Sequence, residues 1–323
     1  ESIDDIEIKY EFKFPSEYHS LEVSIVSIFN NNYTNEITEG SLMNVKGLYY
    51  LYLEKNNDLM KKYYLMAIEL KEADAMCNLG DHLMDVEKNY DLMKTYYLMA
   101  IEFEHADAMN NLGYYYMEEE KNYDLMKKYY LMAIELKQVD SMNNLGDYYL
   151  EVEKNYDLMK KYYLMAIELN NAGAMNCLGD YYLEVEKNYN LMKKYYLMAI
   201  EGKEARAMNN LGYYYMKVEK NFELMKKYYL MAIELKHIYA MSNLGYYYIN
   251  VDKNYDLMKK YFLMAIELKH VDSMKLLKNG VSKLELYVLL SHCESRNDII
   301  TSELVSLRSN KSVSNYINKI NHA

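Results

Sequence analysis

Hydrophobic and polar positions recur along most of the chain with a period of 33 residues. The segment Lys121–Glu135 reads Lys-Asn-Tyr-Asp-Leu-Met-Lys-Lys-Tyr-Tyr-Leu-Met-Ala-Ile-Glu, and seven copies keep its register between Asn56 and Glu267. The dipeptide Leu-Gly marks the same period six times, at Leu79-Gly80, Leu112-Gly113, Leu145-Gly146, Leu178-Gly179, Leu211-Gly212 and Leu244-Gly245. Such regular self-similarity predicts a repeat architecture over residues 41–272.

Each copy predicts two amphipathic helices. In the first helix of one copy, Met109, Leu112 and Tyr116 lie at i, i+3 and i+7 and form one apolar stripe. Asn122 is a suitable N-cap for the second helix, and Asp124 lies in its first turn, where the helix dipole favours an anion. Lys127 and Lys128 of the second helix are predicted to face water, opposite a broad apolar face of Leu125, Met126, Tyr129, Tyr130, Met132, Ala133 and Leu136.

One uninterrupted helix is an alternative, because the period of 33 is a multiple of eleven, and eleven-residue repeats supercoil. Such a helix would leave its broad apolar face in water, whereas stacked helix pairs bury that face. We therefore predict an all-α fold, an α-solenoid of about seven helix–turn–helix repeats of 33 residues.

The residues of each copy resemble a known repeat family. The spacing Ala106-x-x-Met109-x-x-Leu112-Gly113-x-x-Tyr116, followed by Tyr129-Tyr130-x-x-Ala133 and Leu136, is similar to the tetratricopeptide pattern and closer still to the Sel1-like repeat. This resemblance covers all seven copies. It implies a right-handed solenoid whose first helices line a concave groove, and a role as an adaptor that holds a peptide or protein.

The copies also depart from the family pattern. Every copy lacks the usual loop proline and the Gly-rich insert of Sel1 loops, and Met126 replaces a small alanine. The resemblance therefore does not determine the helix crossing angle or the superhelical pitch of this chain. Near-identical repeats in an Asn-, Lys- and Tyr-rich chain are also similar to those of amoeba-infecting giant viruses, which would place the protein in a host cytoplasm or on a virion.

The N-terminal segment, residues 1–40, differs from the repeats. Apolar and charged residues alternate from Ile6 to Phe14 and predict a β-strand, and a capping helix is expected after Pro15. The strand is expected to be an extended arm packed on the first repeat. A remnant of a missing upstream domain, or a strand that pairs with another chain, are the alternatives.

The C-terminal segment, residues 273–323, is predicted to be a degenerate repeat followed by a helical cap, because a terminal repeat must cover its exposed apolar face. The apolar pattern predicts helices at 284–291 and 298–307. This segment has an excess of basic residues, whereas residues 1–40 have an excess of acidic ones. Weak head-to-tail association is thus the alternative to the monomer that we expect.

Composition argues against several classes of protein. A net charge of −11 disfavours a general nucleic-acid binder, and no apolar run approaches the roughly 20 residues that a membrane span needs. Cys77, Cys177 and Cys293 lie far apart, which argues against a disulfide scaffold and indicates a reducing compartment such as the cytoplasm. The 40 tyrosines mostly belong to duplicated Tyr-Tyr pairs and triplets, so their number reflects duplication more than function.

Signals for catalysis are nearly absent. The sequence has no Gly-x-Gly-x-x-Gly, Walker, Gly-x-Ser-x-Gly or His-Glu-x-x-His motif. His82, His105, His237 and His270 are isolated, and none has a second histidine at the spacing of a metal pair. We therefore expect a protein that is not an enzyme and has no cofactor and no metal.

Positions that differ between near-identical copies are the best candidates for binding a partner. By the resemblance, three rows of first-helix residues face the groove. They are Cys77, Asn110, Asn143, Asn176, Asn209 and Ser242; Asp81, Tyr114, Asp147, Asp180, Tyr213 and Tyr246; and Asp85, Glu118, Glu151, Glu184, Lys217 and Asn250. The candidate partner-binding residues are Asn110, Asn143, Asn176, Asn209, Tyr114, Asp147, Asp180, Tyr213, Tyr246, Glu151 and Glu184.

These rows favour an extended segment with basic side chains as the partner. An amide both donates and accepts, which suits a peptide backbone, and tyrosines can anchor cations by stacking or cation–π contacts. The alternatives are structural: Asn bonds to neighbouring helices, Tyr fills gaps between repeats, and the carboxylates form a solvated face. A structural protein that self-assembles or is associated with a particle is the alternative function.

Two further rows are given structural interpretations. Asp74, Asp107, Asp140 and Asp272 are expected to be anions at helix N-termini. The Lys-Lys pairs of the second helices, such as Lys127-Lys128, are expected to form a solvated face and not a surface for nucleic acid or lipid, because acidic residues in the same helices offset them.

Overall fold

The computed structural model describes residues 38–280, 283, 286, 290 and 298–314. The predicted strand from Ile6 to Phe14, the helix after Pro15 and most of the predicted helix at 284–291 lie outside these residues. Every regular element in the described part of the chain is helical, so the all-α prediction is confirmed there.

The chain divides into two units, with the boundary between Lys154 and Asn155, and each unit is described by itself. The helices of the first unit are α2 (Glu39–Tyr52), α3 (Asn57–Glu69), α4 (Ala73–His82), the π-helical η3 (Leu83–Glu87), α5 (Tyr90–Ile101), α6 (Ala106–Glu118), α7 (Tyr123–Glu135) and α8 (Val139–Glu151). Those of the second unit are α9 (Tyr156–Glu168), α10 (Ala172–Glu184), α11 (Tyr189–Glu201), α12 (Ala205–Tyr214), η4 (Tyr215–Glu219), α13 (Phe222–Glu234), α14 (Ile238–Tyr247), η5 (Tyr248–Asp252), α15 (Tyr255–Glu267), α16 (Val271–Gly280) and α18 (Asp298–Arg308).

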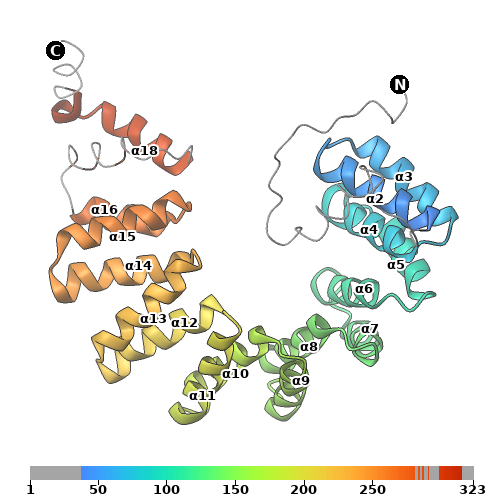
Figure 1. The fold of residues 1–323 in the computed structure, drawn as a ribbon, viewed down its shortest axis with the longest axis horizontal. Coiled ribbons are helices and arrows are strands. Elements are labelled where there is room, and N and C mark those ends of the chain that lie inside the picture. Colours follow the sequence, from blue (N-terminus) through green and yellow to red (C-terminus); the bar gives the residue numbers. More distant parts are fainter. Residues whose placement is uncertain (1–37, 281–282, 284–285, 287–289, 291–297, 315–323) are drawn as a thin grey trace. The chain divides into compact units, whose positions relative to one another are not determined.

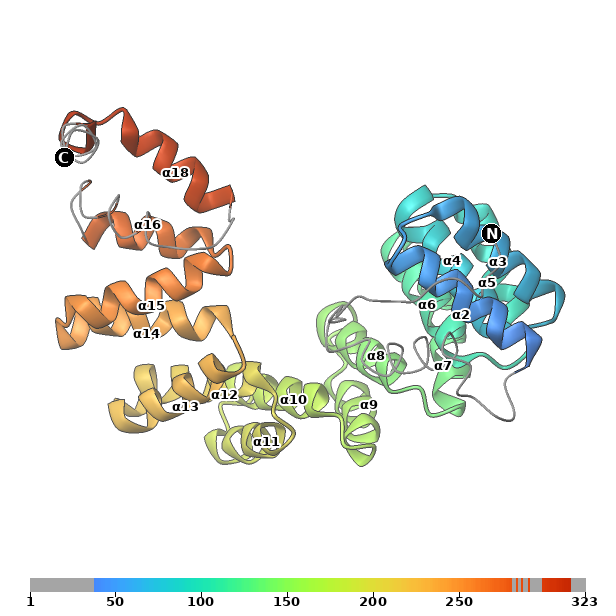
Figure 2. The ribbon, with the colours of Figure 1, turned by 45° about the horizontal axis from the view of Figure 1, so that its top comes forward.

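Within each unit the helices stack as consecutive pairs (Figure 1). The first helix of a repeat packs on the second, as α6 does on α7 and α12 on α13, and each second helix packs on the next first helix. First helices also contact one another, as α4 contacts α6 and α12 contacts α14, and the second view shows the same order of pairs (Figure 2). Each unit is therefore an α-solenoid, as predicted.

One glycine and one aromatic ring form the centre of each repeat whose two helices lie in the same unit. The ring comes from the second helix and lies on the Leu-Gly glycine of the first helix, so a Cβ on Gly113 would be 2.7 Å from Cδ1 of Tyr130. Gly212 and Tyr229 repeat this contact at the same distance. The close approach explains why this glycine recurs, because any side chain there would displace a buried ring.

The predicted apolar stripes are largely observed. Met109, Leu112 and Tyr116 are buried in the first helix, and so are Met126, Tyr129, Tyr130 and Ala133 in the second. Two positions differ from the prediction. Leu136 is 41% exposed because it lies at the C-cap, where the helix has ended, and Lys127 is only partly exposed because it pairs with Glu153 of the next repeat.

Asparagine caps start the second helices, as predicted. Asn122 Oδ1 accepts a hydrogen bond from the backbone N–H of Leu125 at 3.2 Å, and the equivalent asparagine caps every second helix from α3 to α15. Asp74, Asp107, Asp140 and Asp272 lie in the first turns of their helices, which confirms their assignment as N-terminal anions.

The loops place a residue other than glycine in the left-handed region. Lys137, between α7 and α8, has a φ of 61°, a conformation that costs an L-residue about 1–2 kcal/mol. We expect Lys137→Gly to raise the free energy of unfolding by about 0.5–1 kcal/mol. Lys128→Gly, inside α7, is the matched control and is expected to lower it by about 1 kcal/mol. Urea denaturation measures both, and destabilisation by Lys137→Gly would contradict the assignment.

Candidate functional site

The candidate residues lie on the first helices, whose contacts join them within each unit. On α6 the solvent-facing stripe is Asp107, Asn110, Tyr114 and Glu118, with intervals of three and four residues that keep one helix face. We call this face, on α4, α6 and α8 of the first unit and on α10, α12 and α14 of the second, the first-helix surface. The structure thus brings the predicted rows together on one face in each unit.

The asparagines of the first-helix surface bond to one another between repeats. Asn144 Nδ2 donates to Asn110 Oδ1 at 3.2 Å in the first unit, and Asn243 Nδ2 donates to Asn209 Oδ1 at 3.1 Å in the second. The donor is the asparagine directly before the Leu-Gly dipeptide, a position that the sequence rows omitted. The structural alternative for this row is therefore observed, and binding of a partner by the same amides stays a prediction.

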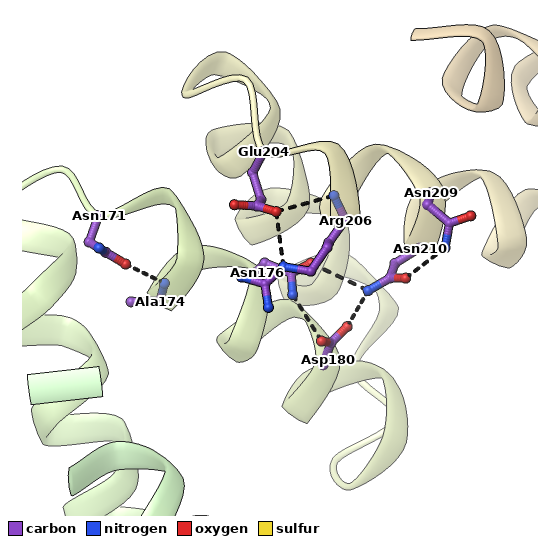
Figure 3. Close-up of polar contacts among 8 residues, drawn as sticks. All are labelled: Asn171, Ala174, Asn176, Asp180, Glu204, Arg206, Asn209 and Asn210. Carbon is purple, nitrogen blue, oxygen red and sulfur yellow. Dashed lines mark hydrogen bonds and ion pairs between the residues drawn. The ribbon is translucent and has the colours of Figure 1, made fainter. Parts of the chain in front are cut away.

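Asp180 is the centre of a polar network in the second unit (Figure 3). Its carboxylate accepts hydrogen bonds from Asn176 Nδ2 at 3.0 Å, from Asn210 Nδ2 at 2.9 Å and from the Tyr196 hydroxyl at 2.5 Å. Burial raises the pKa of Asp180 above the ordinary value of an aspartate, and the three hydrogen bonds oppose this rise. Asp180 therefore joins two repeats and contacts the central ring of its own repeat.

Asp81 repeats this arrangement in the first unit. It accepts hydrogen bonds from the Tyr97 hydroxyl at 2.6 Å and from Asn111 Nδ2 at 2.8 Å, and burial raises its pKa as well. Where the equivalent position is Tyr213, the hydroxyl of the central Tyr229 is buried with no hydrogen-bond partner among the described residues. Asp81 and Asp180 thus accept hydrogen bonds from buried tyrosine hydroxyls.

Other predicted residues are open to solvent. Tyr114 and Tyr213 are each 45% exposed and Tyr246 is 42% exposed. Asp147, Glu151 and Glu184 are also exposed. These six side chains, unlike Asn176 and Asp180, are placed where a partner can reach them.

A pocket of about 590 Å³ opens on the first-helix surface of the first unit. Its walls carry four carboxyl groups, those of Asp74, Asp81, Asp107 and Asp140. Three of these aspartates, Asp74, Asp107 and Asp140, lie in the first turns of their helices as predicted, and the same turns also border the pocket. The signal that could have found the pocket is that aspartate recurs at this position in three consecutive repeats.

Side chains at the starts of the first helices order the pocket rim. His105 caps α6 through Nδ1, and its Nε2 lies 2.9 Å from Asp74 Oδ1. This hydrogen bond lowers the pKa of Asp74 and raises the pKa of His105. Gln138 caps α8 and donates to Asp107 at 3.1 Å and to Asp140 at 3.3 Å. The rim is therefore preorganised with its carboxylates facing a polar cavity.

The Lys-Lys pairs are not equivalent. The first lysine of several pairs reaches the next repeat, where Lys160 Nζ lies 3.0 Å from Glu186 and 5.3 Å from the ring centroid of Tyr181. The second lysine, such as Lys161, is exposed. The predicted solvated face therefore consists of the second lysines, while the first lysines join neighbouring repeats.

Among the described residues, no group of three His, Cys, Asp or Glu side chains is placed to hold a metal ion, and no helix is long and apolar enough to span a bilayer. Cys77 is buried, and burial raises the pKa of its thiol, which makes it an unreactive packing residue.

No protein family model and no curated protein sequence matches the chain. Among solved structures, a Sel1 repeat protein from Oxalobacter formigenes has a TM-score of 0.54 at 20% identity, over 68% of this chain and 98% of that one. An immunity protein from Pseudomonas aeruginosa has a TM-score of 0.46 at 24% identity, over 61% and 81% of the two chains. A protective antigen of uropathogenic Escherichia coli strains, described as displaying an SLR fold, has a TM-score of 0.39 at 17% identity, over 89% and 70%. The fold of this chain is therefore similar to that of a Sel1 repeat protein.

Proposed function

We propose that the protein is a non-catalytic scaffold that binds an extended peptide or protein segment with basic side chains on its first-helix surface. The observation that carries the proposal is the pocket of about 590 Å³ in the first unit, with its four carboxyl groups. The Sel1-like fold supports the same class, because solenoids of this kind present extended surfaces that suit a partner segment. We also propose that the protein is located in the cytoplasm.

The pocket suits a lysine or arginine side chain of the partner. Asp107 and Asp140 lie on its wall and are exposed, and a cation between two carboxylates gains Coulomb energy from both. Asp81 lies deeper and is held by Tyr97 and Asn111. It therefore contributes negative potential without having to move.

The partner backbone and aromatic contacts come from the neighbouring face. Tyr114 is exposed on α6, one helical turn from Asn110, and its ring can stack on a partner side chain or contact a cation. Asp147 and Glu151 on α8 continue the negative surface. An extended basic segment can therefore follow the first helices from repeat to repeat.

The first test reverses two charges on the pocket wall. We expect Asp107→Lys with Asp140→Lys to weaken binding of a short labelled peptide of alternating Lys and Ser by about 10–100-fold, or about 1.4–2.8 kcal/mol. Fluorescence anisotropy with the full chain, at low and at high salt, measures the affinity. Binding by wild type is expected to weaken with salt, because exposed charges are screened.

Asp58→Lys with Asp124→Lys is the matched control, because these exposed aspartates lie in the first turns of α3 and α7 and carry the same helix-dipole penalty. The control is expected to bind the peptide as wild type does. Equal loss in both variants, or no loss in either, would reject the acidic pocket as the binding site. Sedimentation of the unliganded chain tests the alternative function, since a self-assembling structural protein would form large species without a partner.

A further inference from the structure

The charge of the first-helix surface reverses on α12. At the positions of Asp107, Tyr114 and Glu118 on α6, helix α12 and the adjoining η4 carry Arg206, Tyr213 and Lys217. The first unit has acidic residues at the third position, and so has α10 at Glu184. A partner selected for basic side chains would meet repulsion here, so this part of the surface needs a different ligand.

Lys217 lies between two exposed aromatic rings. Its Nζ is 5.8 Å from the ring centroid of Tyr213 and 5.7 Å from that of Tyr246 in the next repeat. Lys217 itself is exposed, and it forms no ion pair with any carboxylate in the described part of the chain. The ammonium group therefore keeps donors directed to solvent, while one face of each tyrosine is occupied by the chain's own cation.

The second helices show what completes such an arrangement. Lys127 Nζ lies 5.1 Å from the ring centroid of Tyr148 and 5.9 Å from that of Tyr149, and Glu153 Oε1 lies 2.5 Å from the same Nζ. In the second unit, Lys193 contacts two tyrosine rings and a glutamate in the same way. At both positions, the lysine that contacts two tyrosine rings also forms an ion pair with a glutamate. On the first-helix surface the carboxylate is the component that the described residues do not provide.

We propose that Lys217, Tyr213 and Tyr246 form a subsite for a glutamate or aspartate side chain of an acidic peptide segment. The carboxylate accepts a charge-assisted hydrogen bond from Nζ, and the carbon chain that carries it packs on the exposed edges of the two tyrosines. This inference rests on the proposed function, because it assumes that the first-helix surface is where peptides bind. It assigns the second unit a ligand of opposite charge to that of the first.

Arg206 extends the positive surface on the same helix face. Its side chain is 59% exposed, and its Nε lies 3.0 Å from Glu204 Oε1. The guanidinium group has five N–H donors, so the bond to Glu204 leaves others for a second carboxylate. Arg206 and Lys217 are eleven residues apart on α12 and η4, which places them at the two ends of one helix face.

The experiment uses the full chain and two labelled peptides, one of alternating Glu and Ser and one of alternating Lys and Ser. We expect Lys217→Glu to weaken binding of the acidic peptide at least about tenfold and not to weaken binding of the basic peptide. This variant is expected to fold, because Glu118, Glu151 and Glu184 occupy the equivalent positions in other repeats. Circular dichroism confirms that each variant is folded.

Lys227→Glu is the matched control. Lys227 is exposed on α13, and its Nζ lies 5.2 Å from the ring centroid of Tyr228, so the variant makes the same charge change at another Lys–Tyr contact. It is expected to bind the acidic peptide as wild type does, and Lys217→Arg is expected to retain most of the affinity. Acidic-peptide binding that is absent in wild type, or unchanged in Lys217→Glu, overturns the inference.

The two proposals can fail separately. Binding of the basic peptide without the acidic one leaves the acidic pocket standing and rejects the Lys217 subsite. If neither peptide binds, the proposed function itself fails. Binding of a single-stranded oligonucleotide that depends on Lys217, in place of the acidic peptide, rejects the peptide as the ligand.

Discussion

Replacing Tyr229 by alanine is expected to lower the free energy of unfolding of the second unit by about 3–5 kcal/mol. The ring is fully buried, and it lies so close to Gly212 that a Cβ there would be 2.7 Å from Cδ1. The glycine has no side chain that could fill the resulting cavity. Because each repeat of a solenoid contacts only its neighbours, the loss weakens the junctions of α12 and α13. Urea denaturation measures the loss, and hydrogen exchange locates it.

Tyr229→Phe separates the ring from its hydroxyl. That hydroxyl is buried without a hydrogen-bond partner among the described residues, and an unsatisfied buried polar group costs about 1–3 kcal/mol. The chain already has Phe262 at the equivalent position, where its ring packs on Gly245. We therefore expect Tyr229→Phe to leave stability unchanged or to raise it slightly. A loss close to that of Tyr229→Ala would show that the hydroxyl, and not the ring, stabilises the repeat.

The helix pairs could be predicted from the sequence because the signals for them are local. The apolar stripe of Met109, Leu112 and Tyr116 depends only on helix geometry, and the cap at Asn122 depends on a residue three positions away. Near-identical copies then extend one correct assignment to the other repeats. The segment from Ile6 to Phe14 has no such copies, and its predicted strand lies outside the described residues.

Contacts between repeats could not be predicted in the same way. Lys127 was expected to face water, but the stacked repeats bring Glu153, 26 residues away, to 2.5 Å from its Nζ. The periodicity placed Tyr129 and Tyr130 alike on the apolar face, and only the crossing of α6 and α7 places Tyr130 on Gly113. Such pairings depend on the helix crossing angle, which the period alone does not determine.

The candidate site was predicted as a surface, but its chemistry was only partly predicted. Tyr114 and Glu151 are exposed as a binding role requires. Asn176 and Asp180 lie in the same rows, yet their polar atoms bond to Tyr196 and Asn210 within the second unit. The sequence alone cannot separate exposed residues of a row from residues that bond to a neighbouring helix. The position of a polar residue that faces the groove and that of one that faces the next helix differ by less than one helical turn.

Replacing Asp180 by alanine is expected to lower the free energy of unfolding by about 2–4 kcal/mol, because Tyr196, Asn176 and Asn210 each lose one hydrogen-bond acceptor. Adding Tyr196→Phe to this variant is expected to recover part of the loss, since it removes one of the buried donors left without a partner. A double-mutant cycle measures the coupling, which we expect at about 1–3 kcal/mol. Additive effects would show that the hydrogen bond between Asp180 and Tyr196 does not stabilise the fold.

The pH dependence of this network separates it from the surface ion pairs. Burial raises the pKa of Asp180 above 3.8 in the folded protein, so its contribution is fully present at low pH and is lost as pH rises through the raised value. Glu219 has the opposite sign, because its hydrogen bond with Lys193 lowers its pKa, and its contribution is lost on acidification. Lowering the pH from neutral should therefore raise the free energy of unfolding of wild type relative to that of Asp180→Asn. The same change should lower the free energy of unfolding of wild type relative to that of Glu219→Gln. The same trend in both comparisons would contradict the assignment, because only a buried carboxyl, and not an exposed ion pair, gains stability by becoming neutral.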